Sequence, residues 1–274
     1  MDHAGTRRRR PGDPGNDAGE RPALRRLTRW PGGSAVTALF LSDLHIDETV
    51  PHVQAGFERV LTEAVGIADD IYILGDLVEV WVGDDDDAAT ANRLRGALRA
   101  ASEHSRVHVM HGNRDFLFGD RFAEETGVTL LADPTCVQIG ERRVLLAHGD
   151  AFCTGDVEYQ AMRRMFRSPD WQRSVLARTL AERRQLAAGL RAQSIAAGAN
   201  KADGIMDVTA EAVAEAMADH GADLLVHGHT HRPAIHQLGD GKRRIVLGDW
   251  GRCGWTLHLG EDPSDDRLLC FGLP

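Results

Sequence analysis

Five short apolar runs, each followed within two residues by Asp or His, constrain the fold of this chain more than any other feature. Three of them are Ala38–Leu41, Ile71–Leu74 and Val107–Met110, and two more, Val144–Ala147 and Leu224–Val226, come later in the chain. Continuous apolar runs of this length are typical of strands that are buried on both faces. We therefore expect five strands whose polar ends lie side by side along one edge of a sheet.

The polar strings that follow these runs have a composition suited to metal binding. In chain order they are Asp43-Leu44-His45, Gly75-Asp76, Gly112-Asn113-Arg114-Asp115, His148-Gly149-Asp150 and His227-Gly228-His229-Thr230-His231. Each alone has an ordinary explanation, such as a turn or a buried histidine. Together they include seven nitrogen and oxygen ligands, which suit two cations such as Mn²⁺. Two such ions, about 3.5–4 Å apart, can clamp a phosphoryl group and activate water, so the strings predict hydrolysis of a phosphate ester or anhydride.

The remaining pattern predicts an α/β fold with two sheets. Helical patterns around 53–65 and 90–101 alternate with the first three runs, as in a mostly parallel layered sheet. Gly140-Glu141 separates two later runs in the manner of an antiparallel hairpin, where a second sheet begins. With a further helix over 207–220 and short strands at 245–247, 256–259 and 268–271, the expected architecture is a four-layer α/β/β/α sandwich.

Two segments depart from this pattern. Residues 1–33 combine Arg7–Arg10 with several Pro and Gly and almost no apolar periodicity, which predicts a disordered, Arg-rich tail. Residues from about 156 to 205 are helical and Arg-rich, with apolar side chains at helical spacing, which predicts a helical insertion that covers the site as a lid. The chain should thus be one domain over 34–274 that carries this insertion.

Charge is divided unevenly along the chain. The net charge is -9, but 1–34 and 156–201 have surpluses of +4 and +5, so the remainder, which holds the polar strings, carries -18. The acidic part suits divalent cations and the basic insertion suits an anionic ligand or lipid surface, with an ordinary solvated surface as an equal alternative. No apolar stretch approaches the roughly 20 residues of a membrane-spanning helix, so a cytoplasmic protein is expected. Four cysteines without paired spacing are interpreted as buried or incidental thiols: Cys136, Cys153, Cys253 and Cys270.

From about Val36 to the end, the order of the polar strings resembles that of the calcineurin-like metallophosphoesterases. The resemblance implies two ions: the first held by Asp43, His45 and His231, the second by Asn113, His148 and His229, with Asp76 as the bridge. His227 lies outside that set and is expected to support the turn.

One position departs from many members of that superfamily, which have histidine after the asparagine as an acid for the leaving group. Here Arg114 follows Asn113. A guanidinium cannot act as an acid near neutral pH, but it can hold phosphate oxygens in a bidentate manner. Because a phosphate leaving group needs less protonation than an alkoxide, this departure favours cleavage of an anhydride.

Longer strings resemble a narrower family, the UDP-2,3-diacylglucosamine diphosphatases of lipid A biosynthesis. They are Tyr72-Ile73-Leu74-Gly75-Asp76-Leu77, His111-Gly112-Asn113-Arg114-Asp115-Phe116-Leu117, Ile205-Met206-Asp207-Val208 and His227-Gly228-His229-Thr230-His231-Arg232-Pro233. The resemblance implies Mn²⁺-dependent hydrolysis of the pyrophosphate bond of UDP-2,3-diacylglucosamine, with attack of water on the α-phosphorus. The products are UMP and 2,3-diacylglucosamine 1-phosphate (lipid X), and the chemistry is expected to depend on Asp76, Asn113 and Arg114.

The same resemblance implies contacts with the nucleotide-linked glycolipid and a location. Substrate contacts are expected from Asn113, Arg114, Asp156, Ser194, Lys201 and His229. Taken alone, Asp156 is also explained as a helix N-cap, Ser194 as a helix-surface hydroxyl and Lys201 as a solvated cation. A lid with apolar and basic faces implies peripheral contact with the anionic cytoplasmic face of the inner membrane.

Alternatives remain on the same residues. A dimetal phosphodiesterase could act on another nucleotide or a nucleic acid, but only 5% of the chain is aromatic and most of it is acidic, unlike polymer-binding proteins. A non-catalytic scaffold would require lost ligands, and all seven are present. Two positions depart from the narrower family, Gly198 in place of Asn and Gly251 in place of His. The acidic run Asp84–Asp87 is interpreted as a solvated loop.

Overall fold

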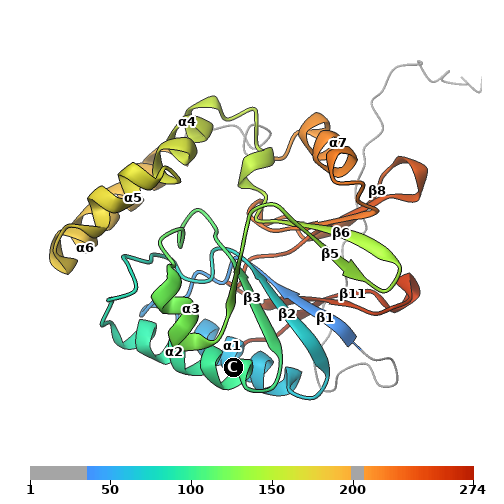
Figure 1. The fold of residues 1–274 in the computed structure, drawn as a ribbon, viewed down its shortest axis with the longest axis horizontal. Helices are drawn as coiled ribbons and strands as arrows, with labels where there is room; N and C mark the ends of the chain where they lie inside the picture. Colours follow the sequence, from blue (N-terminus) through green and yellow to red (C-terminus); the bar gives the residue numbers. More distant parts are fainter. Residues whose placement is uncertain (1–35, 199–206) are drawn as a thin grey trace, which may run out of the picture.

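The computed structural model describes residues 36–198 and 207–274. Within them the chain forms two β-sheets packed face to face, with helices outside both sheets and a helical arm that projects beyond the sandwich (Figure 1). The predicted tail at 1–33 and the end of the predicted insertion lie outside the described residues.

The first sheet has the strand order β11-β10-β1-β2-β3-β4. Its strands are β1 (Val36–Leu41), β2 (Ala68–Leu74), β3 (Arg106–Met110), β4 (Thr129–Leu131), β10 (Gly254–Leu259) and β11 (Arg267–Phe271). Strands β1 to β4 run parallel, and β10 joins β1 in the antiparallel direction. The helices that follow the parallel strands, α1 (Pro51–Ala64), α2 (Ala89–Ser102) and α3 (Asp120–Thr126), form the outer layer.

The second sheet has the order β5-β6-β7-β9-β8. Its strands are β5 (Thr135–Ile139), β6 (Arg142–Ala147), β7 (Leu224–His227), β8 (Ala234–Gln237) and β9 (Arg243–Val246). Strands β5 and β6 form the predicted hairpin, and Gly140 adopts the positive φ of 58° that its turn requires. Helix α7 (Ala210–Asp219) packs Val213 and Met217 against the outer face of this sheet.

Alternating side chains of the buried strands fill two different cores. On β1, Leu39 and Leu41 pack with the α1–α3 layer, while Ala38 and Phe40 point into the core between the two sheets, where they join residues such as Leu146. This is the period-two alternation of a strand, with both faces apolar. The four-layer α/β/β/α fold is confirmed.

The expectation that all five polar strings lie along one edge of a single sheet is wrong. The strings after β1, β2 and β3 belong to the first sheet, and those after β6 and β7 belong to the second. The apolar runs show that a strand is buried, but which sheet it joins depends on long-range pairing. The short elements α3, β4 and β8 were not predicted, because three to seven residues give little periodicity.

The insertion forms the projecting arm of Figure 1, which consists of three helices. They are α4 (Val157–Phe166), α5 (Pro169–Leu176) and α6 (Leu180–Gly198). Asp156 and Ser168 cap the first two by accepting hydrogen bonds from Tyr159 N and Trp171 N. None of the described helices is long and apolar enough to span a bilayer.

Arginines fasten this arm to the sandwich at both of its ends. Arg163 of α4 lies 2.8 Å from an oxygen of Asp150 and 3.0 Å from one of Asp133. On α6, Arg183 is 4% exposed, pairs with Asp85 and donates to Val82 O, while Arg184 pairs with Asp86 and Asp87. The interpretation of Asp84–Asp87 as merely solvated is therefore wrong, because the loop binds the lid.

Candidate metal centre

Backbone hydrogen bonds hold the polar strings together where the strands end. Within the first sheet, Asp43 N donates to Gly75 O (3.1 Å) and His45 N donates to Asp76 O (2.9 Å). Across the two sheets, the backbone N–H of His229 donates to Oδ2 of Asp43 at 2.9 Å. The adjoining edges of both sheets thus form one cluster.

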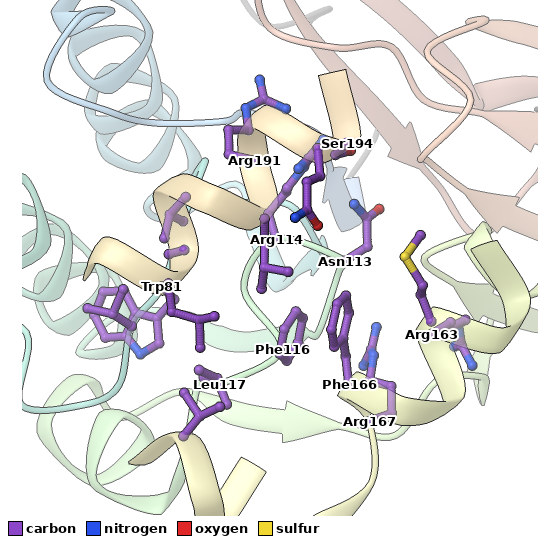
Figure 2. Close-up of a pocket in the computed structure, with 18 of the residues that line it drawn as sticks. Trp81, Asn113, Arg114, Phe116, Leu117, Arg163, Phe166, Arg167, Arg191 and Ser194 are labelled. Atoms are coloured by element: carbon purple, nitrogen blue, oxygen red, sulfur yellow. The ribbon is translucent and has the colours of Figure 1, made fainter. Parts of the chain in front are cut away.

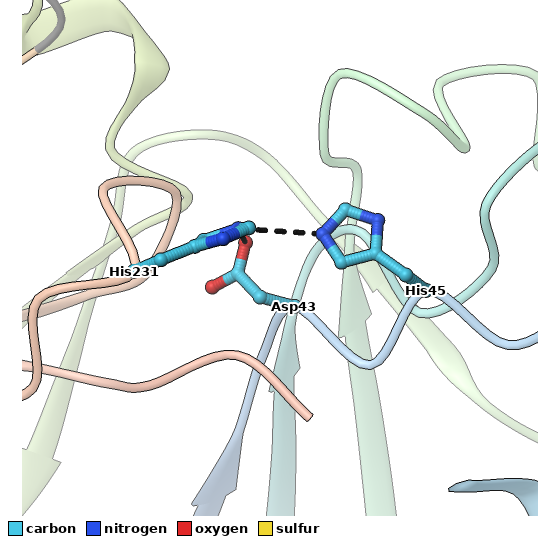
Figure 3. Close-up of side chains that lie close together, drawn as sticks. All are labelled: Asp43, His45 and His231. Carbon is cyan, nitrogen blue, oxygen red and sulfur yellow. Dashed lines mark hydrogen bonds and ion pairs between the residues drawn. The ribbon is translucent and has the colours of Figure 1, made fainter. Parts of the chain in front are cut away.

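The first group of side chains contains Asp43, His45 and His231, whose ligand atoms all lie within 4.8 Å of one another (Figure 3). The Nε2 atoms of the two histidines are 3.3 Å apart, and His231 Nε2 is 3.4 Å from Asp43 Oδ1. Nitrogens bonded to one ion at about 2.0–2.1 Å would lie about 3 Å apart. The hydroxyl of Ser42 donates a hydrogen bond to Asp43 Oδ2. Asp43 Oδ1 is buried without a hydrogen bond and is suited to bind a cation.

The second group surrounds Asn113. Its side-chain oxygen lies 3.0 Å from His148 Nε2 and 2.9 Å from His229 Nδ1. His148 directs Nε2 to this point because its Nδ1 hydrogen-bonds to Leu74 O at 2.9 Å, which fixes the ring in the manner usual for a metal ligand.

Asp76 lies between the two groups. One of its oxygens is 3.8 Å from His45 Nε2 in the first group, and the other is 3.7 Å from His148 Nε2 in the second. Asp43, Asp76 and His148 also form a compact ligand set of their own. The structure thus brings all seven predicted ligands together, and the position of Asp76 fits a bridging role.

Backbone conformation marks the same residues independently. Among the described residues other than glycine, six have a positive φ, and five of these are predicted ligands: Asp43, His45, Asp76, His229 and His231. The left-handed region is sparsely populated by L-residues and costs of order 1–3 kcal/mol for each. Such strain concentrates at functional sites, so the backbone supports the same assignment as the side chains.

Burial and charge set the protonation of the histidines. Burial, with the positive charge of His148 nearby, lowers the pKa of His229 to about 4, which leaves this imidazole neutral and able to bind a cation. Burial likewise lowers the pKa of His227 to about 3; its Nδ1 contacts Gly228 O at 2.9 Å, in agreement with a role in the turn. For His148, burial acts to lower the pKa, but Asp76 and Asp150 outweigh it and raise the value to about 9.

The raised pKa of His148 predicts that metal affinity decreases as the pH is lowered. His148 must lose its proton to bind an ion, so below its pKa of about 9 protons compete with the metal. Each unit of pH should cost about tenfold in affinity, or about 10²-fold between pH 8 and pH 6. Calorimetric titration with Mn²⁺ at several pH values, in buffers of different ionisation enthalpy, would measure affinity and proton release. Equal affinity at pH 6 and pH 8 would contradict the prediction.

A buried carboxylate, Asp115, joins the loop that carries Asp76 to the loop that carries Asn113. Its two oxygens accept hydrogen bonds from Gly112 N (2.6 Å) and Leu77 N (2.7 Å). Burial, together with the negative charge of Asp76, raises its pKa to about 6. Asp115 belongs to one of the polar strings, but no role was predicted for it. Both of its hydrogen-bond donors are backbone N–H groups, which no sequence pattern indicates.

A cavity of about 430 Å³ lies beside the cluster, between the lid and the sandwich (Figure 2). Its apolar lining comes from both parts: Trp81, Phe116, Phe166, Trp171, Leu186 and Leu190. Asn113, Arg114 and Ser194 are grouped on one side of it in Figure 2. The backbone N–H of Arg114 donates to Asp76 Oδ1 (2.8 Å), so the cavity adjoins the ligand cluster directly.

The predicted substrate contacts are placed differently. Ser194 is exposed and lines the cavity, Asp156 caps α4 and is not among the lining residues, and Lys201 lies outside the described residues. Gly198 forms the end of α6. Gly251 is exposed, and a Cβ there would make only ordinary contact with Asp249, so its surroundings do not require glycine.

Comparisons with known proteins agree with this geometry. The family model described as calcineurin-like phosphoesterase matches residues 36–233. The UDP-2,3-diacylglucosamine hydrolase of Chromohalobacter salexigens is 46% identical over 242 residues, which cover 86% of this chain and 98% of that protein. The chain belongs to the UDP-2,3-diacylglucosamine hydrolase family. The relative from Cellvibrio japonicus is also 46% identical, over 81% of this chain and 94% of its own.

Membership of this hydrolase family confirms the resemblance and the prediction of a metal-dependent enzyme. The scaffold alternative loses its basis, since the relatives are named as hydrolases and the predicted ligands lie together in the structure. Among solved structures, an archaeal phosphodiesterase aligns over 85% of this chain and 99% of its own, at 12% identity and with a TM-score of 0.46.

Proposed function

We propose that this chain hydrolyses the pyrophosphate bond of UDP-2,3-diacylglucosamine to UMP and 2,3-diacylglucosamine 1-phosphate, with two Mn²⁺ ions per chain. The observation that carries the proposal is that the apolar cavity adjoins the ligand cluster. Asn113 and Arg114 line the cavity and also contact His148 and Asp76 of the cluster. A phosphate at the cluster would thus have a lipid chain beside it. The names of the family's members support the same substrate.

The donor set fits two divalent cations, held by Asp43, His45 and His231 on one side, by Asn113, His148 and His229 on the other, and by Asp76 between them. Such cations supply Lewis-acid activation of the phosphate and of water. The guanidinium of Arg114 would hold phosphate oxygens next to the cluster, as a planar donor that matches their geometry. Its Nε is buried and makes no hydrogen bond within the protein, so it is free for such a contact.

The cavity would shelter the acyl chains, since each buried methylene contributes about 0.8 kcal/mol. Ser194 would contact the polar part of the substrate from the lid. Further contacts with the substrate are proposed for Asp156, His229 and Lys201. The side chain of Asp156 already accepts a hydrogen bond from Tyr159 N, so any contact with substrate would use its other oxygen.

We also propose peripheral contact of the lid with the cytoplasmic face of the inner membrane. Of the five exposed large apolar side chains in the described part of the chain, four belong to α4 and α5: Val157, Met162, Met165 and Leu176. Apolar side chains among arginines suit the interface of an anionic bilayer. Co-sedimentation with anionic vesicles at low salt is the expected result, and recovery in the supernatant alone would contradict it.

The decisive experiment incubates the purified protein with UDP-2,3-diacylglucosamine and Mn²⁺ in ¹⁸O-water. Attack on the α-phosphorus places the label in UMP. Label in the lipid product would reverse the assignment of the attacked phosphorus, and hydrolysis of an oligonucleotide or cyclic nucleotide in place of the lipid would favour the phosphodiesterase alternative.

Replacing Arg114 with Ala should lower kcat/KM by about 10- to 100-fold, because a hydrogen bond to a charged group contributes about 1.5–3 kcal/mol. Mn²⁺ binding should persist, since the group that contacts Asp76 is the backbone N–H of this residue. Arg164→Ala, which removes an exposed arginine of α4, is the matched control. Steady-state kinetics that do not distinguish the two variants would remove the phosphate-binding role.

A further inference from the structure

A glutamate and an arginine link the lid to one of the predicted metal ligands. Glu79 lies in the segment after β2 and is 15% exposed. One of its oxygens is 3.0 Å from His45 Nδ1, and the other is 2.5 Å from Nε of Arg191, on lid helix α6. Glu79 thus contacts a predicted metal ligand with one oxygen and the lid with the other.

We propose that Glu79 is a positioning residue for His45, and that Arg191 of the lid holds Glu79 in place. This inference rests on the proposed dimetal function. His45 faces the cluster with Nε2, which lies 3.3 Å from His231 Nε2, and its other ring nitrogen, Nδ1, lies 3.0 Å from an oxygen of Glu79. A carboxylate in this position fixes the orientation and tautomer of a ligating imidazole and makes it more basic.

The backbone around Glu79 is suited to this role because it is held against the His45 segment. Ile46 N donates to Leu77 O, and Glu79 N donates to Ile46 O, both at 3.1 Å. These bonds continue the parallel pairing of β1 and β2 beyond the strands as a bridge between Ile46 and Val78. The backbone of Glu79 is therefore held in place next to His45. The ion pair with Arg191 limits the rotation of the Glu79 side chain.

Arg191 adds a dependence on the lid. It is about one third exposed, so its ion pair is a modest one. Its partner is nevertheless a group in contact with a metal ligand, whereas Arg184, on the same helix, pairs with Asp86 and Asp87 away from the cluster. The two arginines therefore separate two roles of α6: fastening the lid, and supporting the ligand.

The test measures Mn²⁺ binding to the full chain in the absence of substrate, by electron paramagnetic resonance of the free ion. Glu79→Ala should weaken one of the two sites by about 10- to 100-fold and leave the other unchanged. Glu79→Gln keeps an acceptor for His45 Nδ1–H and should recover part of the loss. A general loss of structure would instead lower both affinities and the melting temperature of the metal-free protein.

Arg191→Ala should weaken the same site by about two- to fivefold, and Arg184→Ala should leave both sites unchanged. Two sites of unaltered affinity in Glu79→Ala would overturn the positioning role, and identical binding by the two arginine variants would overturn the part played by the lid. If the unmodified protein binds no Mn²⁺, the proposed dimetal function fails instead, so the two failures can be told apart.

Discussion

Asp76→Ala is expected to reduce Mn²⁺-dependent hydrolysis of UDP-2,3-diacylglucosamine by at least about 10³-fold in kcat. Asp76 lies within 3.8 Å of histidines in both ligand groups, so its loss affects both proposed sites. Metal ions contribute several kcal/mol to such reactions, and each 1.36 kcal/mol is a factor of ten in rate. Turnover should be measured at saturating Mn²⁺, together with metal stoichiometry.

The matched control for this variant is Asp240→Ala. Asp240 is the sixth described residue other than glycine with a positive φ, at 58°, and it is exposed in the loop between β8 and β9. Both variants place alanine in a left-handed conformation, which costs each about 1–2 kcal/mol, and Asp76→Ala also leaves Arg114 N without its acceptor. Only the Asp76 variant should lose activity. Near-normal turnover in Asp76→Ala would refute the bridging assignment.

Asp115→Ala should destabilise the protein by about 2–6 kcal/mol. The change leaves the buried N–H groups of Gly112 and Leu77 without acceptors, and each unsatisfied group costs about 1–3 kcal/mol. Because the raised pKa of about 6 makes the ionised carboxylate less favourable in the folded protein, the loss should be largest below that pKa; chemical unfolding at pH 5 and at pH 8 would measure both values. Activity should fall as well, since these loops carry Asp76 and Asn113.

Asp115→Asn separates hydrogen bonding from packing at this position. The amide keeps one acceptor oxygen but turns an NH₂ group towards the second N–H, so about half of the loss is expected. If alanine and asparagine both cost less than about 1 kcal/mol, the two hydrogen bonds do not hold the loops together.

The sequence predicts the layers and the seven candidate ligands because both follow from local patterns. An apolar run marks a buried strand, and a polar residue within two positions of its end must lie near the end of the strand, as Asp43 and Asp76 do. The structure brings the seven side chains together, while their roles toward metal remain predictions. The expectation that all five polar strings lie along one edge was wrong because the apolar runs of β6 and β7 look like those of the first sheet, although the hairpin at Gly140-Glu141 marked the start of the second.

Other features could not be predicted because they depend on pairs distant in sequence. The Asp84–Asp87 loop has the composition of a solvated turn, and only the approach of Arg183 and Arg184 shows that it holds the lid. Glu79 is likewise an isolated acid in an apolar stretch, and its position beside His45 appears only in three dimensions. Asp156 showed the reverse case, since its ordinary role as a helix cap is present in the structure.

The division of the ligands between the two sheets has a consequence for survival of the protein when metal is scarce. Four predicted ligands follow strands of the first sheet and three follow strands of the second: Asp43, His45, Asp76 and Asn113, then His148, His229 and His231. Bound ions would connect the two sheets and stabilise the folded protein. A tenfold fall in the concentration of free metal would lower the free energy of unfolding by about 1.4 kcal/mol for each bound ion. We therefore expect starvation for the metal to expose the chain to proteolysis as well as to stop catalysis.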